Sequence, residues 1–233
     1  MKKKVALFGS SGFVGQELFK QLSNNSNYEV FGYTRSNFEE AFDLEFDYVI
    51  NAAMPAARFK AKNNPLWDFV ESVEKTANLF YKLKYKKFIL VSSLSARCQR
   101  DTIYGHHKYL AEQLVLASEN TLIVRLGPMY GPSLTKGVLI DIINRSKVFV
   151  SEDSRYAFAP LSFVSQWISE NLDQNGIREV GANNSISLKE VASKAGVTID
   201  FEGDVDHQEI ENPSSQFPDV NLVFNFLQQK MEK

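Results

Sequence analysis

The sequence predicts an α/β protein with a doubly wound, parallel β-sheet. Over the first 131 residues, short apolar runs alternate with longer segments of helical periodicity. This is the order of elements that produces a parallel sheet covered by helices on both faces. The segment DYVINAA at 47–53 also has the continuous apolar core of a strand buried on both faces. We therefore expect one domain over 1–131 and a small mixed α/β lobe over 132–233 that interleaves with it.

Each element follows from a local pattern. KVALFG is a short apolar run that ends at a glycine, which predicts a strand, and Val14, Leu18 and Leu22 follow it at helical spacing. Similar patterns define the other elements, and they become shorter in the second lobe. The expected strands are 4–9, 28–34, 46–53, 87–93, 121–127, 147–150, 178–181 and 197–201, and the expected helices are 13–25, 64–82, 104–118, 136–146, 162–173, 187–195 and 219–233.

Charge and composition exclude several classes of partner. The 233 residues include 26 basic and 28 acidic side chains, a net charge of −2, so no basic field favours a nucleic acid polymer or an anionic membrane. The apolar run at 5–8 is too short for a signal peptide, and no run approaches the roughly 18 apolar residues that cross a membrane. The single cysteine, Cys98, cannot form an internal disulfide. We expect a soluble, cytoplasmic protein.

A glycine-rich turn, GSSGFVG at 9–15, stands between the first strand and the first helix. Glycine allows a tight turn and removes the Cβ that would block a phosphate, while the helix N-terminus offers unpaired N–H groups. An ordinary strand-to-helix turn is the alternative, but the position at the first strand of a β-α-β unit favours a dinucleotide site. The residues expected to bind the cofactor here are Gly9, Ser11, Gly12, Phe13, Val14 and Gly15.

Arg35, at the end of the second predicted strand, bears on which dinucleotide binds. NAD-binding proteins usually place an Asp or Glu there for the ribose 2′-hydroxyl, and no acid occupies 30–36. A cation favours a 2′-phosphate, so we expect NADP as the preferred cofactor and NAD as the second choice. The alternative is a solvated surface arginine.

Tyr104 and Lys108 are four residues apart on a predicted helix, so they share a face. A lysine ammonium beside the phenol would favour the phenolate and lower the pKa of the tyrosine, which makes it a usable proton donor or acceptor. Ser93 ends a predicted buried strand at the carboxyl edge of the sheet, where ligands of such folds bind. These three residues form the predicted catalytic group, although the Tyr-x-x-x-Lys spacing alone is a weak pattern.

Taken together, the motifs resemble those of the short-chain dehydrogenase/reductase superfamily, in its extended branch of NAD(P)-dependent nucleotide-sugar epimerases, dehydratases and reductases. GSSGFVG matches that branch's GxxGxxG, DYVINAA its DxVIHxAA strand, and VSSLSA its serine motif. YGHHKYLAEQLV is similar to its catalytic helix, and the helix at 64–82 matches at Pro65, Thr76 and Asn78. VRLGPMYGP and SISLKEVASKAGVTID resemble its later segments, so the resemblance covers nearly the whole chain.

The resemblance implies a Rossmann-type fold and an enzyme that acts on a nucleotide-linked sugar by 4-keto reduction or epimerisation. Tyr104 would be the acid/base catalyst, Lys108 would bind the nicotinamide ribose, and Ser93 would polarise the reacting C–O group. Dehydration fits less well, because the Asp-Glu pair of that subgroup is missing after Ser93. The backbone around three further residues would line the cofactor site: Ala52, Ala53 and Leu126.

The chain departs from the family pattern in four places. Only about ten residues separate the second strand from the third, so the strand that usually meets the adenine is expected to be missing. Ser72 replaces an asparagine, the segment 155–168 lacks the usual acids, and the second lobe is short. These departures support an alternative function, a catalytically silent NADP-binding module with a sensor or structural role, which the intact catalytic group opposes.

His106 and His107 occupy variable positions of the Tyr-x-x-x-Lys spacing. Adjacent helical residues diverge by about 100°, so both imidazoles cannot bind one ion, and we expect no metal site. One of them is expected to pack or face solvent, and contact of the other with substrate stays open. The helices at 64–82 and 104–118 are those through which members of the family often dimerise, so a homodimer is compatible with the sequence.

Overall fold

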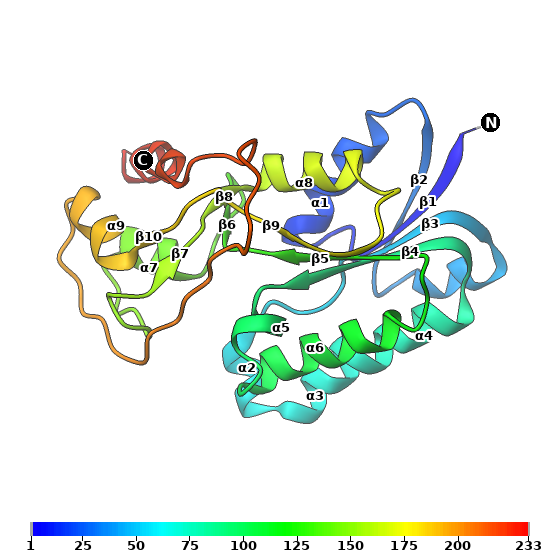
Figure 1. The fold of residues 1–233 in the computed structure, drawn as a ribbon, viewed down its shortest axis with the longest axis horizontal. Helices are drawn as coiled ribbons and strands as arrows, with labels where there is room; N and C mark the ends of the chain where they lie inside the picture. Colours follow the sequence, from blue (N-terminus) through cyan, green and yellow to red (C-terminus); the bar gives the residue numbers. More distant parts are fainter. Residues whose placement is uncertain (1, 233) are drawn as a thin grey trace. The chain divides into compact units, whose positions relative to one another are not determined.

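The structure, a computed structural model, describes residues 2–232 and contains the expected parallel sheet. Six strands are hydrogen-bonded in the order β2-β1-β3-β4-β5-β9 (Figure 1). β1 pairs in parallel with β2 and β3, and β3 pairs in parallel with β4. The strands of this sheet are β1 (Lys3–Phe8), β2 (Tyr28–Tyr33), β3 (Glu45–Asn51), β4 (Lys84–Ser93), β5 (Thr121–Leu126) and β9 (Gly176–Val180).

Helices cover both faces of the sheet, which confirms the doubly wound α/β class. α1 (Phe13–Ser23) lies on one face, and α4 (Lys75–Lys82) and α6 (Ile103–Val115) lie on the other (Figure 1). Their apolar stripes are buried as the 3.6-residue period requires, with Leu18 and Leu22 of α1 fully buried. The aromatic core beneath α4 and α6 includes Phe46, Phe80 and Phe88.

The helix expected over 64–82 is a continuous helical run with a wider turn at its centre. It consists of α3 (Pro65–Phe69), a π-type turn η2 (Val70–Glu74) and α4. Asn64 begins it, because its Oδ1 accepts a hydrogen bond from the Trp67 N–H at 3.1 Å and Pro65 occupies the first helical position. Two short helices flank this face, α2 (Arg58–Asn63) before it and α5 (Ser95–Cys98) after β4.

The strand expected to be missing after β2 is missing. Between β2 and β3 the chain forms only a 3₁₀ helix, η1 (Phe38–Asp43), and β2 is therefore an edge of the sheet. Asn37 stabilises the turn that leaves β2, since its Oδ1 accepts a hydrogen bond from the Thr34 N–H at 2.7 Å. The sheet thus has the Rossmann strand order with its outermost strand removed.

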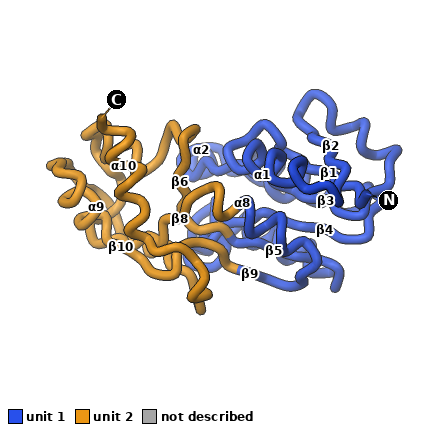
Figure 2. The backbone as a smooth tube through the Cα atoms, turned by 90° about the horizontal axis from the view of Figure 1, so that it is seen from above, with its two compact units in different colours: residues 1–125, 165–178 blue, residues 126–164, 179–233 orange. Residues whose placement is uncertain are grey.

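The chain forms two compact units (Figure 2). Unit 1 comprises Met1–Arg125 and Ser165–Arg178, and unit 2 comprises Leu126–Val164 and Glu179–Lys233. The assignment of cofactor binding to 1–131 and of substrate binding to 132–233 stays a prediction.

Unit 2 contains two small two-stranded sheets and its own apolar core. The strands β6 (Met129–Tyr130) and β8 (Ala159–Pro160) are paired, as are β7 (Arg155–Tyr156) and β10 (Ile186–Ser187). The expected strands at 147–150 and 197–201 form no ladder and meet only in an isolated β-bridge between Val148 and Phe201. Val148 makes both hydrogen bonds of this bridge, through its N–H to Asp200 and through its carbonyl to Glu202. Its helices are α7 (Val138–Ile143), α9 (Leu188–Lys194) and α10 (Val223–Met231), and a 3₁₀ turn, η3 (Val220–Leu222), precedes α10. A further helix, α8 (Leu161–Glu170), begins in unit 2 and lies in unit 1 from Ser165 onward.

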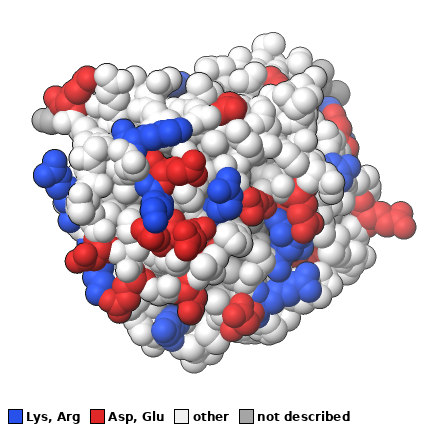
Figure 3. All heavy atoms as spheres, turned by 60° about the vertical axis from the view of Figure 1, so that its left-hand side comes forward, with Lys and Arg blue, Asp and Glu red and all other residues white. Residues whose placement is uncertain are grey.

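The surface carries charges of both signs. Figure 3 shows lysine and arginine side chains interspersed with aspartate and glutamate over one face, as the near-neutral net charge of −2 leads one to expect. Within residues 2–232, none of the helices has the length and apolar character that a membrane crossing requires.

Candidate active site

The backbone of the turn at 9–15 requires glycine, whether or not a ligand binds there. Gly9 has φ +81°, and a Cβ there would lie 2.7 Å from the carbonyl oxygen of Ala52. A Cβ on Gly15 would lie 2.0 Å from the carbonyl oxygen of Gly9. The Gly12 N–H closes the turn by donating to Gly9 at 2.9 Å. The three glycines therefore bring the end of β1, the start of α1 and the residue after β3 into direct contact.

The N-terminus of α1 is open to an anion. Gly12 is the N-cap residue and has no side chain with which to bond the first-turn N–H groups, so these groups are available to a ligand. Ser11 and Gly12 are exposed, Phe13 and Val14 are half-buried, and Gly15 is buried. These features fit the phosphates of a dinucleotide.

The loop after β3 is fixed by a buried polar chain. Asn51 donates through Nδ2 to Thr76 Oγ1 at 2.9 Å, and Thr76 donates to the carbonyl of Ser72 at 2.6 Å. Asn51 Oδ1 accepts from the Ala53 N–H at 3.1 Å, and the Ala52 N–H donates to Phe8 at 3.0 Å. Ala52 and Ala53 thus lie beside Gly9, where the resemblance places them. Leu126 ends β5 in unit 2, and its cofactor role stays a prediction.

Arg35 follows β2 and is 83% exposed. Its Nη2 lies 3.5 Å from a carboxylate oxygen of Glu71, on η2. Glu71 is shared with Lys75, whose Nζ lies 2.6 Å from its other oxygen. Because Arg35 is itself exposed and Glu71 keeps Lys75 as a partner, Arg35 can exchange Glu71 for a phosphate at small cost.

Ser93, Tyr104 and Lys108 are brought together in unit 1. Ser93 is the last residue of β4, and Tyr104 and Lys108 lie on the first two turns of α6. The side chains of Tyr104 and Ser93 lie beside each other, and Lys108 Nζ lies 5.1 Å from the centre of the Tyr104 ring. Tyr104 and Lys108 are buried. The predicted catalytic group is therefore a contiguous cluster, although its catalytic role stays a prediction.

Gly105 explains how α6 comes this close to β4. A Cβ at this position would lie 2.0 Å from the carbonyl oxygen of Gln99 and 2.6 Å from that of Ser95. The first turn of α6 therefore packs directly on α5, the helix that follows Ser93. Sequence reasoning assigned no role to Gly105 and missed this one.

Replacing Gly105 with alanine is expected to separate α6 from α5, because backbone carbonyls rather than flexible side chains oppose the new methyl group. We expect a loss of about 1–3 kcal/mol in the free energy of unfolding, the usual cost of overpacking, measured by urea denaturation. Gln113→Ala, an exposed position on the same helix, is the matched control. If Gly105→Ala lost no more unfolding free energy than Gln113→Ala, the packing argument would be contradicted.

The electrostatics of Tyr104 differ from the sequence expectation. Burial raises its pKa, while Arg58 and the hydrogen bond from Ser93 act in the opposite direction. Burial also lowers the pKa of Lys108 to about 7, against the attraction of Asp68 and Glu112. The cation that favours the phenolate is thus Arg58.

Arg58 is a site residue that sequence reasoning missed. Its guanidinium carbon lies 5.8 Å from the centre of the Tyr104 ring, and its Nη2 donates to Ser95 Oγ at 3.1 Å. Ser95 in turn is bonded to Ser93 Oγ through its backbone N–H at 3.2 Å. Arg58 stands in the basic segment RFKAK, which has no motif to distinguish it from a solvated helix.

The two histidines have different surroundings. His106 is exposed, whereas His107 is buried with its Nδ1 2.8 Å from Asp68 Oδ2. Arg125 binds the buried carboxylate of Glu112 with both Nε and Nη2, the shorter distance being 2.7 Å. Arg125 is therefore structural.

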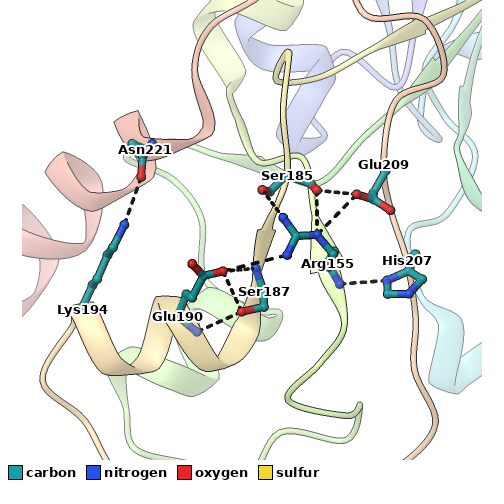
Figure 4. Close-up of polar contacts among 8 residues, drawn as sticks. All are labelled: Arg155, Ser185, Ser187, Glu190, Lys194, His207, Glu209 and Asn221. Atoms are coloured by element: carbon teal, nitrogen blue, oxygen red, sulfur yellow. Dashed lines mark hydrogen bonds and ion pairs between the residues drawn. The ribbon is translucent and has the colours of Figure 1, made fainter.

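Unit 2 contains a separate polar cluster around Arg155 (Figure 4). The guanidinium donates to the Ser185 carbonyl at 2.8 Å and lies 3.6 Å from Glu209 and 4.0 Å from Glu190. Glu190 also completes the capping box that starts α9 at Ser187. Because two carboxylates already surround Arg155, the cluster ties the chain segments of unit 2 together.

The strand order and the glycine turn are those of Rossmann-type dinucleotide-binding proteins. The sequence profile of one such group, the NAD dependent epimerase/dehydratase family, matches residues 5–148. The chain belongs to this family. The predicted family, and with it a nicotinamide cofactor, are thereby confirmed.

Solved structures share the fold over almost their whole length. dTDP-4-dehydrorhamnose reductase from Bacillus anthracis, in complex with NADP, has 17% sequence identity and a TM-score of 0.77, covering 100% of this chain and 97% of its own. UDP-glucose 4-epimerase from Thermotoga maritima, with UDP-glucose, has 15% identity and a TM-score of 0.78, covering 98% and 99%. UDP-N-acetylglucosamine 4-epimerase from Methanobrevibacter ruminantium, in complex with UDP-N-acetylmuramic acid, has 17% identity and a TM-score of 0.75, covering 100% and 97%. No curated protein sequence matches the chain significantly.

Proposed function

We propose that the protein reduces the keto group of a nucleotide-linked sugar with NADPH, and that epimerisation of such a sugar is the alternative reaction of the same site. The observation that carries this proposal is the cluster in which half-buried Ser93 and buried Tyr104 lie together beside Lys108. Solved structures of the same fold with NADP, UDP-glucose and UDP-N-acetylmuramic acid support the substrate class.

Side chains of the protein orient the sugar carbonyl and supply the proton that its oxygen receives. Ser93 holds the sugar carbonyl oxygen by a hydrogen bond, and its own Oγ is fixed by the Ser95 N–H. Tyr104 donates its hydroxyl proton to that oxygen, and Lys108 beside the ring returns a proton to the phenolate. A bound nicotinamide supplies or accepts the hydride. The glycine turn and the α1 N-terminus hold the cofactor phosphates.

Burial of Tyr104 favours reduction over an initial oxidation. Because burial raises its pKa, Tyr104 is held in the protonated form, which is ready to donate a proton to a carbonyl. An epimerase that first oxidises a hydroxyl needs the phenolate as a base. Arg35, a cation suited to a 2′-phosphate, supports the same direction, because NADPH is the usual reductant of biosynthetic enzymes.

The deciding experiment is incubation of the purified protein with hydroxy- and 4-keto-sugar nucleotides, with NADPH and NADH in separate reactions. Reduction consumes one NADPH per product, which absorbance and mass spectrometry measure together. Epimerisation gives a product of unchanged mass with no net cofactor consumption. NADPH binding without turnover on the whole panel would overturn the proposal in favour of the silent NADP-binding module, which the missing edge strand and short lobe support.

Arg35→Gln is expected to weaken NADPH binding and to leave NADH binding within twofold. A charge-assisted hydrogen bond to the 2′-phosphate is worth about 1.5–3 kcal/mol, so Kd for NADPH should rise roughly 10- to 100-fold. Cofactor fluorescence measures both constants. Lys75→Gln, which removes the other cation paired with Glu71, is the matched control. Equal effects on both cofactors would show that Arg35 does not read the 2′-phosphate.

A further inference from the structure

A chain of hydrogen bonds leads from Arg58, on α2, to the candidate catalytic residue Ser93. The Arg58 guanidinium donates through Nη2 to Ser95 Oγ at 3.1 Å. Ser93 Oγ donates to the same oxygen at 3.3 Å, and it accepts from the Ser95 N–H at 3.2 Å. Arg58 and Ser95 are 37 positions apart in the sequence, so this chain of bonds exists only in the folded protein.

The backbone of Ser95 is fixed independently of Arg58. Ser95 is fully buried at the start of α5, and its carbonyl accepts from the Gln99 N–H at 3.0 Å. The helix α6 packs against the same carbonyl, which would lie 2.6 Å from a Cβ on Gly105. Arg58, in contrast, is an exposed residue. Its hydrogen bond therefore fixes the side chain of Ser95 rather than the helix that carries it.

The two hydrogen bonds that Ser95 Oγ accepts are of unequal strength. A serine oxygen has two lone pairs, and the two donors use both of them. The bond from Arg58 is charge-assisted, which makes it the stronger of the two. The bond from Ser93 is long at 3.3 Å, since O–H···O distances are usually about 2.5–3.0 Å. The Ser93 proton is therefore held only weakly by Ser95.

This weak bond bears directly on the proposed reduction. Ser93 must turn its O–H toward the keto oxygen of the sugar while its own oxygen stays in place. The Ser95 N–H holds that oxygen wherever the Ser93 proton points. A strong bond from Ser93 to Ser95 Oγ would have to break first, and a neutral hydrogen bond is worth roughly two- to tenfold in rate.

We propose that Arg58, by binding Ser95 Oγ, leaves the Ser93 hydroxyl ready to bind the keto oxygen of the substrate. Arg58 and Ser95 are positioning residues in this scheme, and the inference rests on the proposed function of Ser93. Arg58 also lies beside Tyr104, with its guanidinium carbon 5.8 Å from the ring centre. The cation is thus on the side of the site where negative charge develops on the keto oxygen.

The first test is structural and needs no turnover. Arg58→Met keeps the length of the side chain and removes its donors. Ser95 Oγ should then turn toward Ser93, and the distance between the two Oγ atoms should shorten from 3.3 Å to about 2.8 Å. Crystal structures of the wild-type protein and the variant measure this distance. A distance that is unchanged or longer in the variant overturns the proposal.

The second test uses activity and separates positioning from simple damage. Arg58→Met should lose roughly two- to tenfold in kcat, because Ser93 must break a stronger bond. Adding Ser95→Ala removes the competing oxygen and retains the N–H, so the double variant should recover most of this loss. A merely structural role of Arg58 predicts that the two losses add. A double variant as slow as Arg58→Met, or slower, therefore rejects the inference.

Lys62→Met is the matched control. Lys62 is exposed on the same helix as Arg58, so this variant also removes one positive charge from α2. It should retain the wild-type kcat and the wild-type Ser93–Ser95 distance, and an equal loss of kcat would contradict the role of Arg58. Failure of the proposed function is distinguishable. A wild-type protein without turnover rejects that function, while the crystal structures still decide whether Arg58 controls the Ser93–Ser95 bond.

Discussion

Tyr104→Phe is expected to reduce kcat by roughly 10²- to 10⁴-fold, the range that a positioned general acid contributes, while Kd for NADPH changes by less than about threefold. The substitution removes only the phenolic oxygen. The ring near Arg58 and Lys108 remains, so the fold and the dinucleotide turn should be unaffected. Steady-state kinetics on the active substrate and cofactor fluorescence measure the two quantities.

Tyr109→Phe is the matched control for this variant. Tyr109 lies on the same helix, and its ring is also covered by an arginine, with the Arg100 guanidinium 4.2 Å from the ring centre. We expect it to retain wild-type activity. If Tyr104→Phe kept more than a tenth of the wild-type rate, the proton would have to come from another group, and the proposed mechanism would be wrong.

Much of the fold follows from local patterns, which is why the sequence predicts it. The glycine turn is required by contacts within 9–15 and by the nearby Ala52 carbonyl, so the motif alone marks it. The length of the segment between β2 and β3 likewise shows that no further strand fits there. The Tyr104–Lys108 spacing places both side chains on one face of α6 regardless of what the helix packs against.

The remainder of the candidate site depends on packing between distant segments. Arg58 reaches Tyr104 from a short helix that precedes α3, and nothing in RFKAK indicates it. Asp68 pairs with His107 because α3 and α6 are adjacent in the fold, which no spacing within either helix encodes. The sequence-based expectation that the pKa of Tyr104 is lowered was wrong for the same reason. Burial raises this pKa, and burial is a property of the assembled site that the neighbouring lysine does not reveal.

Glu112→Ala is expected to lower the free energy of unfolding by about 3–5 kcal/mol, the cost of breaking a buried ion pair by removing one partner. Glu112 is fully buried, receives the bidentate Arg125 guanidinium, and accepts a hydrogen bond from Ser92 Oγ at 2.6 Å. The loss is a large part of the roughly 5–15 kcal/mol by which domains are stable. Urea denaturation measures it, with the exposed Glu119→Ala as control.

The double variant Glu112→Leu with Arg125→Met separates two free energies: the net stabilisation by the ion pair, and the cost of leaving one buried charge without its partner. Apolar residues of similar volume often replace a buried ion pair at little cost, so this variant should recover most of the stability lost in Glu112→Ala. A double variant less stable than Glu112→Ala would mean that the pair itself, and not the burial of an unbalanced guanidinium, stabilises the contact between β5 and α6.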